Sequence, residues 1–262
     1  MFPTFTLGPW TLETYTFAYS LALIVFGMFA FHRLRQGNRP MHLLRRNLPL
    51  VILAGVAGTY LVSIIPALID FVRAGTFSWH VHGNFFGAFL GVSLAILILV
   101  PRNTPGELGR VADLGALPWP LFQAIGRIGC LGAGCCYGRP TDSWFGRYLC
   151  NAHGEWAVRY PTQIISGIDY LIIFLILVGV ERYGLRRARR EGLTDQRIWP
   201  FDGLIFLLYF NLYCVDRFSM ECLRGDATPL VGPFSWVHFA TFAGWLILTG
   251  LIVWNWRRAT QR

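Results

Sequence analysis

A short segment in the middle of the chain places one arginine, Arg127, among five glycines. These glycines are Gly126, Gly129, Gly132, Gly134 and Gly138. Glycine lets the backbone approach a ligand closely and adopt positive φ values. An arginine at membrane depth is energetically costly and therefore indicates a functional site. The alternative is a contact between helices through small residues, with the arginine reaching to the membrane surface.

A histidine, His82, opens another apolar segment and is followed by Gly83. The unperturbed pKa of histidine lies near neutrality, so its imidazole can accept a proton during catalysis. His80 lies two residues earlier in the chain. The alternative for both histidines is an interfacial position in which the ring only makes hydrogen bonds.

Four polar side chains in a third segment, Tyr213, Arg217, Glu221 and Arg224, recur at helical spacing. Such spacing places them on one face of a helix. Together with Arg127, the two arginines could bind a phosphodiester through paired guanidinium donors. The alternative is a ladder of arginine and glutamate that only stabilises the helix.

The composition indicates that membrane-spanning helices position these three segments. Hydrophobic residues make up 54% of the 262-residue chain and charged residues only 14%, whereas a soluble domain carries about 25% charged residues. All 23 basic residues are arginines, and the net charge is +9. The arginines cluster in short loops between apolar runs, which favours orientation in a membrane over binding of nucleic acid.

Apolar runs of about 20 residues predict an all-α, polytopic membrane protein with about seven transmembrane helices in a single domain, residues 1–262. The expected spans are residues 15–31, 48–71, 82–100, 114–129, 161–180, 201–220 and 236–256. The fourth run is short and contains Pro118 and Pro120, so we expect a broken helix that protein buries or that borders a cavity. Residues 130–160 are expected to form a small irregular segment on the outer, periplasmic face.

The distribution of arginine predicts the orientation of these helices. Sixteen arginines follow the first, third, fifth and seventh expected spans, and seven lie on the other side or at its span ends. The positive-inside rule therefore places the N-terminus outside and the C-terminus in the cytoplasm. His82, Arg127, Arg217 and Arg224 are then expected at the outer ends of their spans.

All six cysteines are also expected toward the outer face. They are Cys130, Cys135, Cys136, Cys150, Cys214 and Cys222. Cysteines outside the cytoplasm commonly form disulfides, so we expect at least one disulfide, or a special role, among the first four. A metal site of Cys130, Cys135, Cys150 and His153 matches no zinc spacing, and no metal site is predicted.

These segments together resemble the prolipoprotein diacylglyceryl transferase family. The family signature has the form G-R-x-G-N-F-x-N-G-E-x-x-G, and residues 126–138 here read GRIGCLGAGCCYG. Other positions similar to the family are Leu7-Gly8-Pro9, Tyr15, His82-Gly83-Asn84, Asp113, Gln123, Pro161-Thr162-Gln163 and the pattern from Tyr213 to Arg224. The resemblance covers nearly the whole chain in the family's order.

The chain departs from the family pattern at a few positions. Cys130 and Ala133 stand where the signature has asparagine, and Cys135 stands where it has glutamate. The glutamate that follows the family's Pro-Ser-Gln is absent, and Ser166 lies close to that place. A carboxylate that is lost near a reaction centre removes a proton acceptor.

The resemblance implies an enzyme of lipoprotein maturation in the bacterial inner membrane. The thiol of a lipobox cysteine in a preprolipoprotein would attack the terminal glycerol carbon of phosphatidylglycerol, and glycerol 1-phosphate would leave. The implied partners are phosphatidylglycerol, the lipobox peptide and membrane lipids; no nucleic acid and no cofactor are expected.

The resemblance also implies roles for particular residues. His82, assisted by Tyr213, would generate the thiolate, and Arg127 and Arg217 would stabilise the phosphate as catalytic residues. Residues expected to contact or hold the lipid phosphate are Tyr15, Gly83, Gln123, Gly126, Arg127, Gly129, Gly138, Arg217, Glu221 and Arg224.

Two other functions fit the sequence. One is a divergent transferase that moves a lipid group to a different acceptor, which the altered signature suggests. The other is a non-catalytic membrane protein that binds or transports lipid or peptide, because a broken, glycine-rich span can line a transport path. No paired inverted repeat supports transport.

Overall fold

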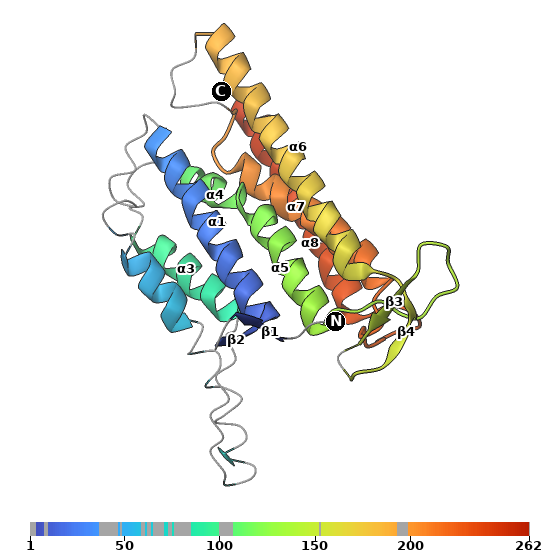
Figure 1. Ribbon diagram of the computed structural model, residues 1–262. Coiled ribbons are helices and arrows are strands. Elements are labelled where there is room, and N and C mark those ends of the chain that lie inside the picture. Colours follow the sequence, from blue (N-terminus) through green and yellow to red (C-terminus); the bar gives the residue numbers. More distant parts are fainter. Residues whose placement is uncertain are drawn as a thin grey trace. The chain divides into compact units, whose positions relative to one another are not determined.

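The computed structural model of the chain (Figure 1) describes most of its helices. The described residues are 4–7, 10–36, 47, 49–58, 61, 64, 71–72, 75, 85–99, 107–151, 153–192 and 199–261. The chain divides into two compact units, one formed by residues 1–36 and 109–262 and the other by residues 37–108. Within the second unit, the described helical parts include residues 49–58 and α3 (Phe85–Leu99).

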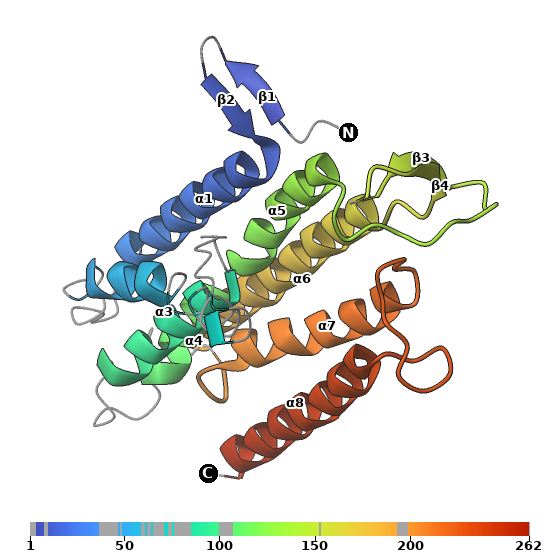
Figure 2. The same ribbon diagram turned by 90° about the horizontal axis from the view of Figure 1, so that it is seen from below.

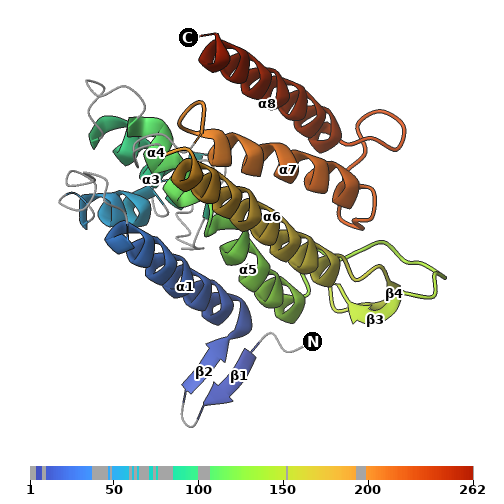
Figure 3. The same ribbon diagram turned by 90° about the horizontal axis from the view of Figure 1, so that it is seen from above.

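The first unit contains the remaining helices and all four strands that are described. Its helices are α1 (Thr14–Gln36), α4 (Glu107–Ala116, which begins at the edge of the other unit), α5 (Trp119–Ala133), α6 (Thr162–Arg190), α7 (Leu204–Glu221) and α8 (Trp236–Thr260). Helix α1 packs on α5, α5 on α6, α6 on α7, and α7 on α8. Figures 2 and 3 show these five helices side by side in that order.

A buried core joins α5, α6 and α7. Its large side chains include Leu117 before α5, Tyr170 and Leu177 from α6, and Ile205 and Tyr209 from α7. The opposite side of α6 carries exposed apolar side chains, which are Ile164, Ile168, Leu171, Ile172, Leu175 and Ile176. An apolar surface of this kind suits contact with lipid.

Two described helices are long and apolar enough to cross a membrane, α6 and α8. Shorter apolar helical stretches occur at Phe17–Arg33, Pro49–Gly58 and Leu90–Leu99 among the described residues. The mostly helical fold that the sequence predicts is therefore confirmed.

The expected fourth span consists of two helices. Helix α4 ends at Ala116, and α5 begins at Trp119 with Pro118 as its N-cap residue. Proline suits the first turn of a helix but has no N–H for a helix interior, which explains the break. The Asp113 carboxylate accepts hydrogen bonds from the backbone N–H groups of Gly203 (2.8 Å) and Phe206 (2.9 Å). It thereby fixes the start of α7 against α4.

Two β-hairpins add to the helical fold, and the sequence predicted neither. The first pairs β1 (Thr4–Leu7) with β2 (Trp10–Glu13). The second pairs β3 (Arg147–Cys150) with β4 (Trp156–Arg159), so the segment 130–160 is more regular than expected.

The turn of the second hairpin depends on one side chain, Asn151. Its Oδ1 accepts hydrogen bonds from the N–H groups of His153 (3.0 Å) and Glu155 (2.9 Å). Asparagine commonly forms such turns with the backbone that follows it. The turn is therefore stabilised by hydrogen bonds to one asparagine side chain. The alternation of apolar residues in the sequence does not indicate these bonds.

Candidate functional site

The glycine segment, residues 126–138, ends in an extended stretch that joins two distant parts of the chain. Arg139 N–H donates to the carbonyl of Leu223, 3.0 Å away, and Gly225 N–H donates to the carbonyl of Tyr137, 2.9 Å away. On the other side, Tyr160 N–H donates to the carbonyl of Arg139 at 3.2 Å. The end of α5, the residues after α7 and the end of β4 therefore meet at one place.

Three glycines that were expected to contact lipid have packing roles in this arrangement. A Cβ atom at Gly126 would lie 3.0 Å from the Tyr19 ring, and one at Gly129 would lie 2.9 Å from Cβ of Ala18. Both glycines therefore let α5 approach α1 closely. Gly138 lies against the backbone carbonyl of Tyr160, where a side chain would collide. Close packing against Tyr19, Ala18 and Tyr160 thus explains a glycine at these three positions, and a role in lipid binding stays a prediction.

Arg127 of α5 contacts α6 through its guanidinium group. Its Nη2 donates a hydrogen bond to the hydroxyl of Tyr170 at 3.1 Å, and its Cζ lies 5.4 Å from the centre of the Tyr170 ring. The Tyr170 side chain is 1% exposed, and its ring stacks on Tyr213 of α7 with centroids 6.5 Å apart. The arginine is therefore held inside the unit, unlike one that extends to the membrane surface.

The predicted polar ladder is present at the end of α7, with one difference. Arg217 Nη2 forms an ion pair with Glu221 Oε2 at 2.8 Å, and the Glu221 carboxylate is buried. Helix α7 ends at Glu221, so the expectation that Arg224 shares its helical face is wrong. Arg224 instead lies in the stretch paired with Gly138, where it still comes within 3.9 Å of Glu221 and pairs with Asp226 at 2.6 Å.

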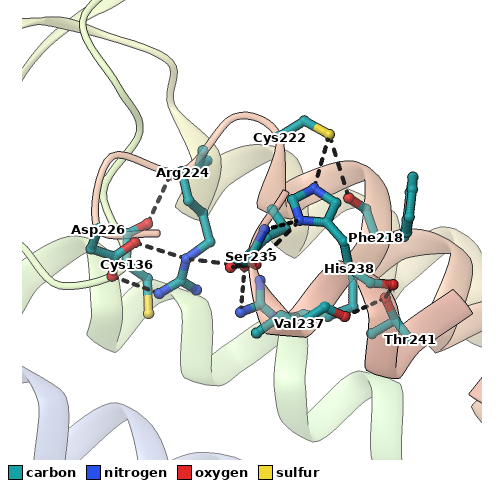
Figure 4. A network of polar contacts seen from close by, with 12 residues as sticks. Cys136, Phe218, Cys222, Arg224, Asp226, Ser235, Val237, His238 and Thr241 are labelled. Carbon is teal, nitrogen blue, oxygen red and sulfur yellow. Dashed lines mark hydrogen bonds and ion pairs between the residues drawn. The ribbon is translucent and has the colours of Figure 1, made fainter. Parts of the chain in front are cut away.

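A serine and a histidine at the start of α8, Ser235 and His238, complete this network (Figure 4). The Ser235 hydroxyl donates to Glu221 Oε1 at 2.8 Å, and the Ser235 N–H donates to Nδ1 of His238 at 3.0 Å. Since Nδ1 accepts this bond, the ring proton resides on Nε2, which lies 3.3 Å from Sγ of Cys222. Sequence reasoning missed both residues, although a serine three residues before a polar side chain is a typical start of a helix.

A buried carboxylate, Asp216, also lies in this region and was not predicted as a site residue. Among the residues that the structure describes, its oxygens make no hydrogen bond of standard geometry, but its carboxyl group interacts with that of Asp169. Its electrostatic neighbours are Asp169 of α6 and the two arginines Arg127 and Arg217. A carboxylate beside two guanidinium groups can orient them or accept a proton.

Two other residues that the sequence predicts for the site are Gln123 of α5 and Tyr15 of α1. The Tyr209 hydroxyl donates to Gln123 Oε1 at 2.6 Å, which ties α7 to α5. The ring of Tyr15 lies 4.6 Å from that of Tyr19, whose hydroxyl lies 3.9 Å from Sγ of Cys130. Both residues predicted from the sequence thus border the segment that contains Arg127.

All six cysteines are free thiols in the structure, and none of them forms the expected disulfide. The Sγ atoms of Cys130, Cys135 and Cys136 lie within 4.8 Å of one another; we call these residues the thiol cluster. Cys150 lies apart, with its Sγ on the carbonyl of Asn151 at 3.4 Å.

Two residues of the thiol cluster follow α5, and their pKa values shift in opposite directions. Hydrogen bonds from the thiols of Cys130 and Cys135, and then the charges of Arg224 and Arg127, lower the pKa of Cys136. Hydrogen bonds with Cys130 and Cys136, together with burial, raise the pKa of Cys135. The charges of Arg224 and Arg127 thus favour a negative charge in this part of the cluster.

The turn that carries Cys135 and Cys136 is fixed through its backbone. The hydroxyl of Thr162 donates to the carbonyl of Cys136 at 2.8 Å, and Nε2 of Gln163 donates to the carbonyl of Cys135 at 2.9 Å. Both donors are buried at the start of α6. Gly134, with a φ of +73°, ends α5 and turns the chain toward this contact.

Comparison with known families gives this geometry a context. Residues 3–256 match the family model described as prolipoprotein diacylglyceryl transferase. The chain belongs to this family. No solved structure matches it.

Relatives within the transferase family support the match over most of the chain. The phosphatidylglycerol–prolipoprotein diacylglyceryl transferase of Clostridium tetani (strain Massachusetts / E88) is 30% identical over 211 residues, which cover 78% of this chain and 76% of the relative. The corresponding transferase 2 of Clostridium perfringens (strain 13 / Type A) is 30% identical, with 79% and 75% covered. The transferase of Acidiphilium cryptum (strain JF-5) is 27% identical over 236 residues, with 83% and 77% covered.

The resemblance to this transferase family in the sequence is therefore confirmed. The structure brings Arg127, Tyr213, Arg217, Glu221 and Arg224 into neighbouring positions at the ends of α5 and α7. His82 and Gly83 lie outside the described residues, so their roles stay predictions.

Proposed function

We propose that this chain transfers the diacylglyceryl group of phosphatidylglycerol to the lipobox cysteine of a preprolipoprotein. In this reaction, sulfur forms a bond to the terminal glycerol carbon, and the bond between that carbon and the phosphate oxygen breaks. Glycerol 1-phosphate leaves with the electron pair of the broken bond, and a base takes the thiol proton. Membership of the transferase family and the position of the arginines support this proposal.

The observation that carries the proposal is a pair of arginines whose charges act on the same tyrosine, Tyr213. The charges of Arg217 and Arg127 both act on Tyr213, which stacks on the Tyr170 ring that holds Arg127. Guanidinium groups bind phosphate oxygens through two aligned donors each. Because negative charge develops on the leaving phosphate, donors that are already oriented lower the barrier.

The thiolate must be generated before it can attack, since the thiol itself is a poor nucleophile. We assign this step to His82, with Tyr213 assisting, because an imidazole exchanges protons near neutral pH. Asp216 is assigned to orient Arg127 and Arg217, whose charges it faces. Glu221, fixed by Ser235, orients Arg217 and Arg224.

We further propose that the protein spans the bacterial inner membrane about seven times, with its N-terminus outside. In this orientation, the ends of α5 and α7 face the periplasm, where translocated lipoproteins arrive. The arginine-rich C-terminal end of α6, with Arg187, Arg189 and Arg190, then lies in the cytoplasm, as the positive-inside rule requires.

Transfer to a different acceptor is the second candidate, and the thiol cluster is the observation that favours it. Cys130 and Cys135 replace an asparagine and a glutamate of the signature, so side chains beside the proposed phosphate site differ in charge. Purified protein with labelled phosphatidylglycerol and a lipobox peptide separates the possibilities. Thioether-linked peptide and equimolar glycerol 1-phosphate support the main proposal, whereas glycerol 1-phosphate without modified peptide indicates another acceptor. Lipid binding without turnover indicates a non-catalytic protein and contradicts both.

A further inference from the structure

Three thiols that the transfer reaction does not use lie together where α5 ends. Cys130 in the last turn of α5 is buried, and Cys135 and Cys136 in the turn that follows are partly exposed. Among the residues that the structure describes, no other group of three or more His, Cys, Asp or Glu side chains comes as close together. We propose that the thiol cluster binds one thiophilic d10 metal ion, Cu(I) or Zn(II).

The spacing of the sulfur atoms suits a metal ion better than a disulfide. In a zinc–thiolate site with Zn–S bonds of about 2.3 Å, neighbouring sulfurs lie roughly 3.8 Å apart. A disulfide requires an S–S distance of about 2.05 Å. The Sγ atoms of the cluster lie within 4.8 Å of one another, so closing around an ion requires only small rotations of the three side chains.

The donor set selects the class of metal. All three donors are sulfur, and soft thiolate ligands select Cu(I) and Zn(II) over Mg²⁺, Ca²⁺ or Mn²⁺. Three thiolates suffice for Cu(I) in a trigonal site, whereas Zn(II) prefers four ligands and would take the fourth from solvent or a bound molecule. With either ion the site is anionic, and the charges of Arg224 and Arg127, which act on Cys136, offset it.

The backbone holds two of the donors before any ion arrives. Thr162 and Gln163 bind the carbonyls of Cys136 and Cys135. Cys136 has a φ of +56°, a left-handed conformation that a residue other than glycine adopts only when its surroundings enforce it. Donors that are fixed in this way lose little freedom on binding, which favours tight coordination.

Metal competition on the purified full-length protein tests the proposal. Reduced, metal-free protein in detergent is titrated anaerobically with Cu(I) against bathocuproine disulfonate, and with Zn(II) against 4-(2-pyridylazo)resorcinol. We expect one equivalent of ion to be withheld from one or both chelators. X-ray absorption at the metal edge should then show three sulfur neighbours at about 2.2–2.3 Å. The two titrations decide which ion the site prefers.

Variants identify the donors. Cys136→Ser and Cys130→Asn should each weaken binding by about a hundredfold or more, since each removes one ligand. Cys130→Asn carries the residue of the family signature, so it provides a second variant if Cys136→Ser does not fold, as judged by its elution in detergent. Cys150→Ser and Cys222→Ser, which leave the cluster intact, should bind as the wild type does.

Several results would overturn the proposal. They are a wild-type protein that withholds no ion from either chelator, a Cys130→Asn variant with unchanged affinity, and a reduced protein whose bound ion has no sulfur neighbours. A disulfide within the cluster of the protein as isolated, seen after alkylation without reduction, would also contradict it. These readouts are independent of turnover, so they separate failure of the metal site from failure of the proposed transferase function.

Discussion

Arg127 of α5 donates a hydrogen bond to the hydroxyl of Tyr170 of α6 at 3.1 Å, and 28 residues of loop and hairpin separate the two helices in the sequence. The bond fixes the guanidinium between α5 and α6. Among the described residues Tyr170 is its hydrogen-bond partner, so the other donors can bind a ligand near the ends of these helices. A charged group that is positioned before the substrate arrives stabilises developing charge without reorganisation.

Replacement of either arginine by lysine should remove most of the turnover. Arg127→Lys and Arg217→Lys keep the positive charge but lose the paired donors, and lysine cannot reproduce that geometry. We expect losses of about tenfold to a hundredfold, corresponding to about 1.5–3 kcal/mol for a charged hydrogen bond. Release of glycerol 1-phosphate from phosphatidylglycerol measures the effect.

Arg187→Lys provides the matched control for this prediction. Arg187 lies near the other end of α6, where its exposed side chain pairs with Glu191 at 2.8 Å, and exposed pairs of this kind contribute little. If both site variants retained the turnover of the control, the arginines would only stabilise the helices.

Tyr170→Phe should lower turnover by a smaller factor. This variant removes the hydroxyl that accepts the bond from Arg127 but retains the ring beneath the guanidinium. Loss of one acceptor that only positions the arginine should reduce kcat about threefold to tenfold while KM for the peptide stays similar. Tyr183→Phe, at an exposed position of the same helix, is the control. An equal effect of both substitutions would contradict a positioning role for Tyr170.

Ser235→Ala should destabilise the protein. The Ser235 hydroxyl holds the buried Glu221 carboxylate, and the residue caps α8. Removal of a cap and of one hydrogen bond to a buried charge should cost about 1–2 kcal/mol and lower Tm by a few degrees. Ser219→Ala, whose hydroxyl is exposed and bonds only to the Val215 carbonyl of its own helix, should leave Tm unchanged. Intrinsic fluorescence during heating in detergent measures both, and equal Tm values for the two variants would exclude this role.

His82 is assigned as the base and Asp216 as a residue that orients the arginines. These two roles predict different pH dependences of kcat/KM for variants of the two residues. If His82 is the base, kcat/KM of the wild type falls below a pH of about 6.5, where the imidazole is protonated. His82→Ala should then lower turnover and remove this decrease of kcat/KM at low pH, while binding of phosphatidylglycerol persists. Asp216→Asn should lower turnover about tenfold, because it removes the carboxyl group that faces two arginines, but it should retain the pH dependence below about 6.5. The reverse pattern, with this pH dependence lost in Asp216→Asn, would make Asp216 the base.

Reporter fusions test the orientation that the arginine distribution predicts. Alkaline phosphatase fused after Gly154 should be active, and the same enzyme fused after Gly192 or Arg262 should be inactive. Green fluorescent protein at these positions should give the opposite result. Activity of the phosphatase at Gly192 would reverse the proposed orientation of α6 and place the arginine pair on the cytoplasmic side.

Residue types and spacing were sufficient to predict the arginine ladder and the family. The pair Arg217 and Glu221 is separated by one helical turn, so its contact follows from helix geometry alone. The position of Arg224 could not be predicted in this way, because α7 stops at Glu221 and the next residues pair with Tyr137 and Arg139. These bonds join segments that are about 85 residues apart.

The buried polar groups were harder to predict for similar reasons. Asp216 adjoins Arg217 in the sequence, and such a neighbour suggests a solvent-exposed charge pair. Its burial depends on α6, which brings Asp169 and Tyr170 toward α7. The thiol cluster depends on the left-handed turn at Gly134, which returns Cys135 and Cys136 toward Cys130. The positions of the cysteines in the sequence suggest disulfides, but they do not indicate the turn that brings three of the thiols together.

Thr162 and Gln163 hold the turn at Cys135 and Cys136 only through main-chain carbonyls, which every amino acid possesses. These two hydrogen bonds therefore do not depend on the side chains of Cys135 and Cys136. Substitution of Cys135 or Cys136 can thus change the side chains near Arg127 while the hydrogen bonds from Thr162 and Gln163 remain. The same turn can therefore present a carboxylate or a thiol at position 135, because the hydrogen bond that holds it does not involve that side chain.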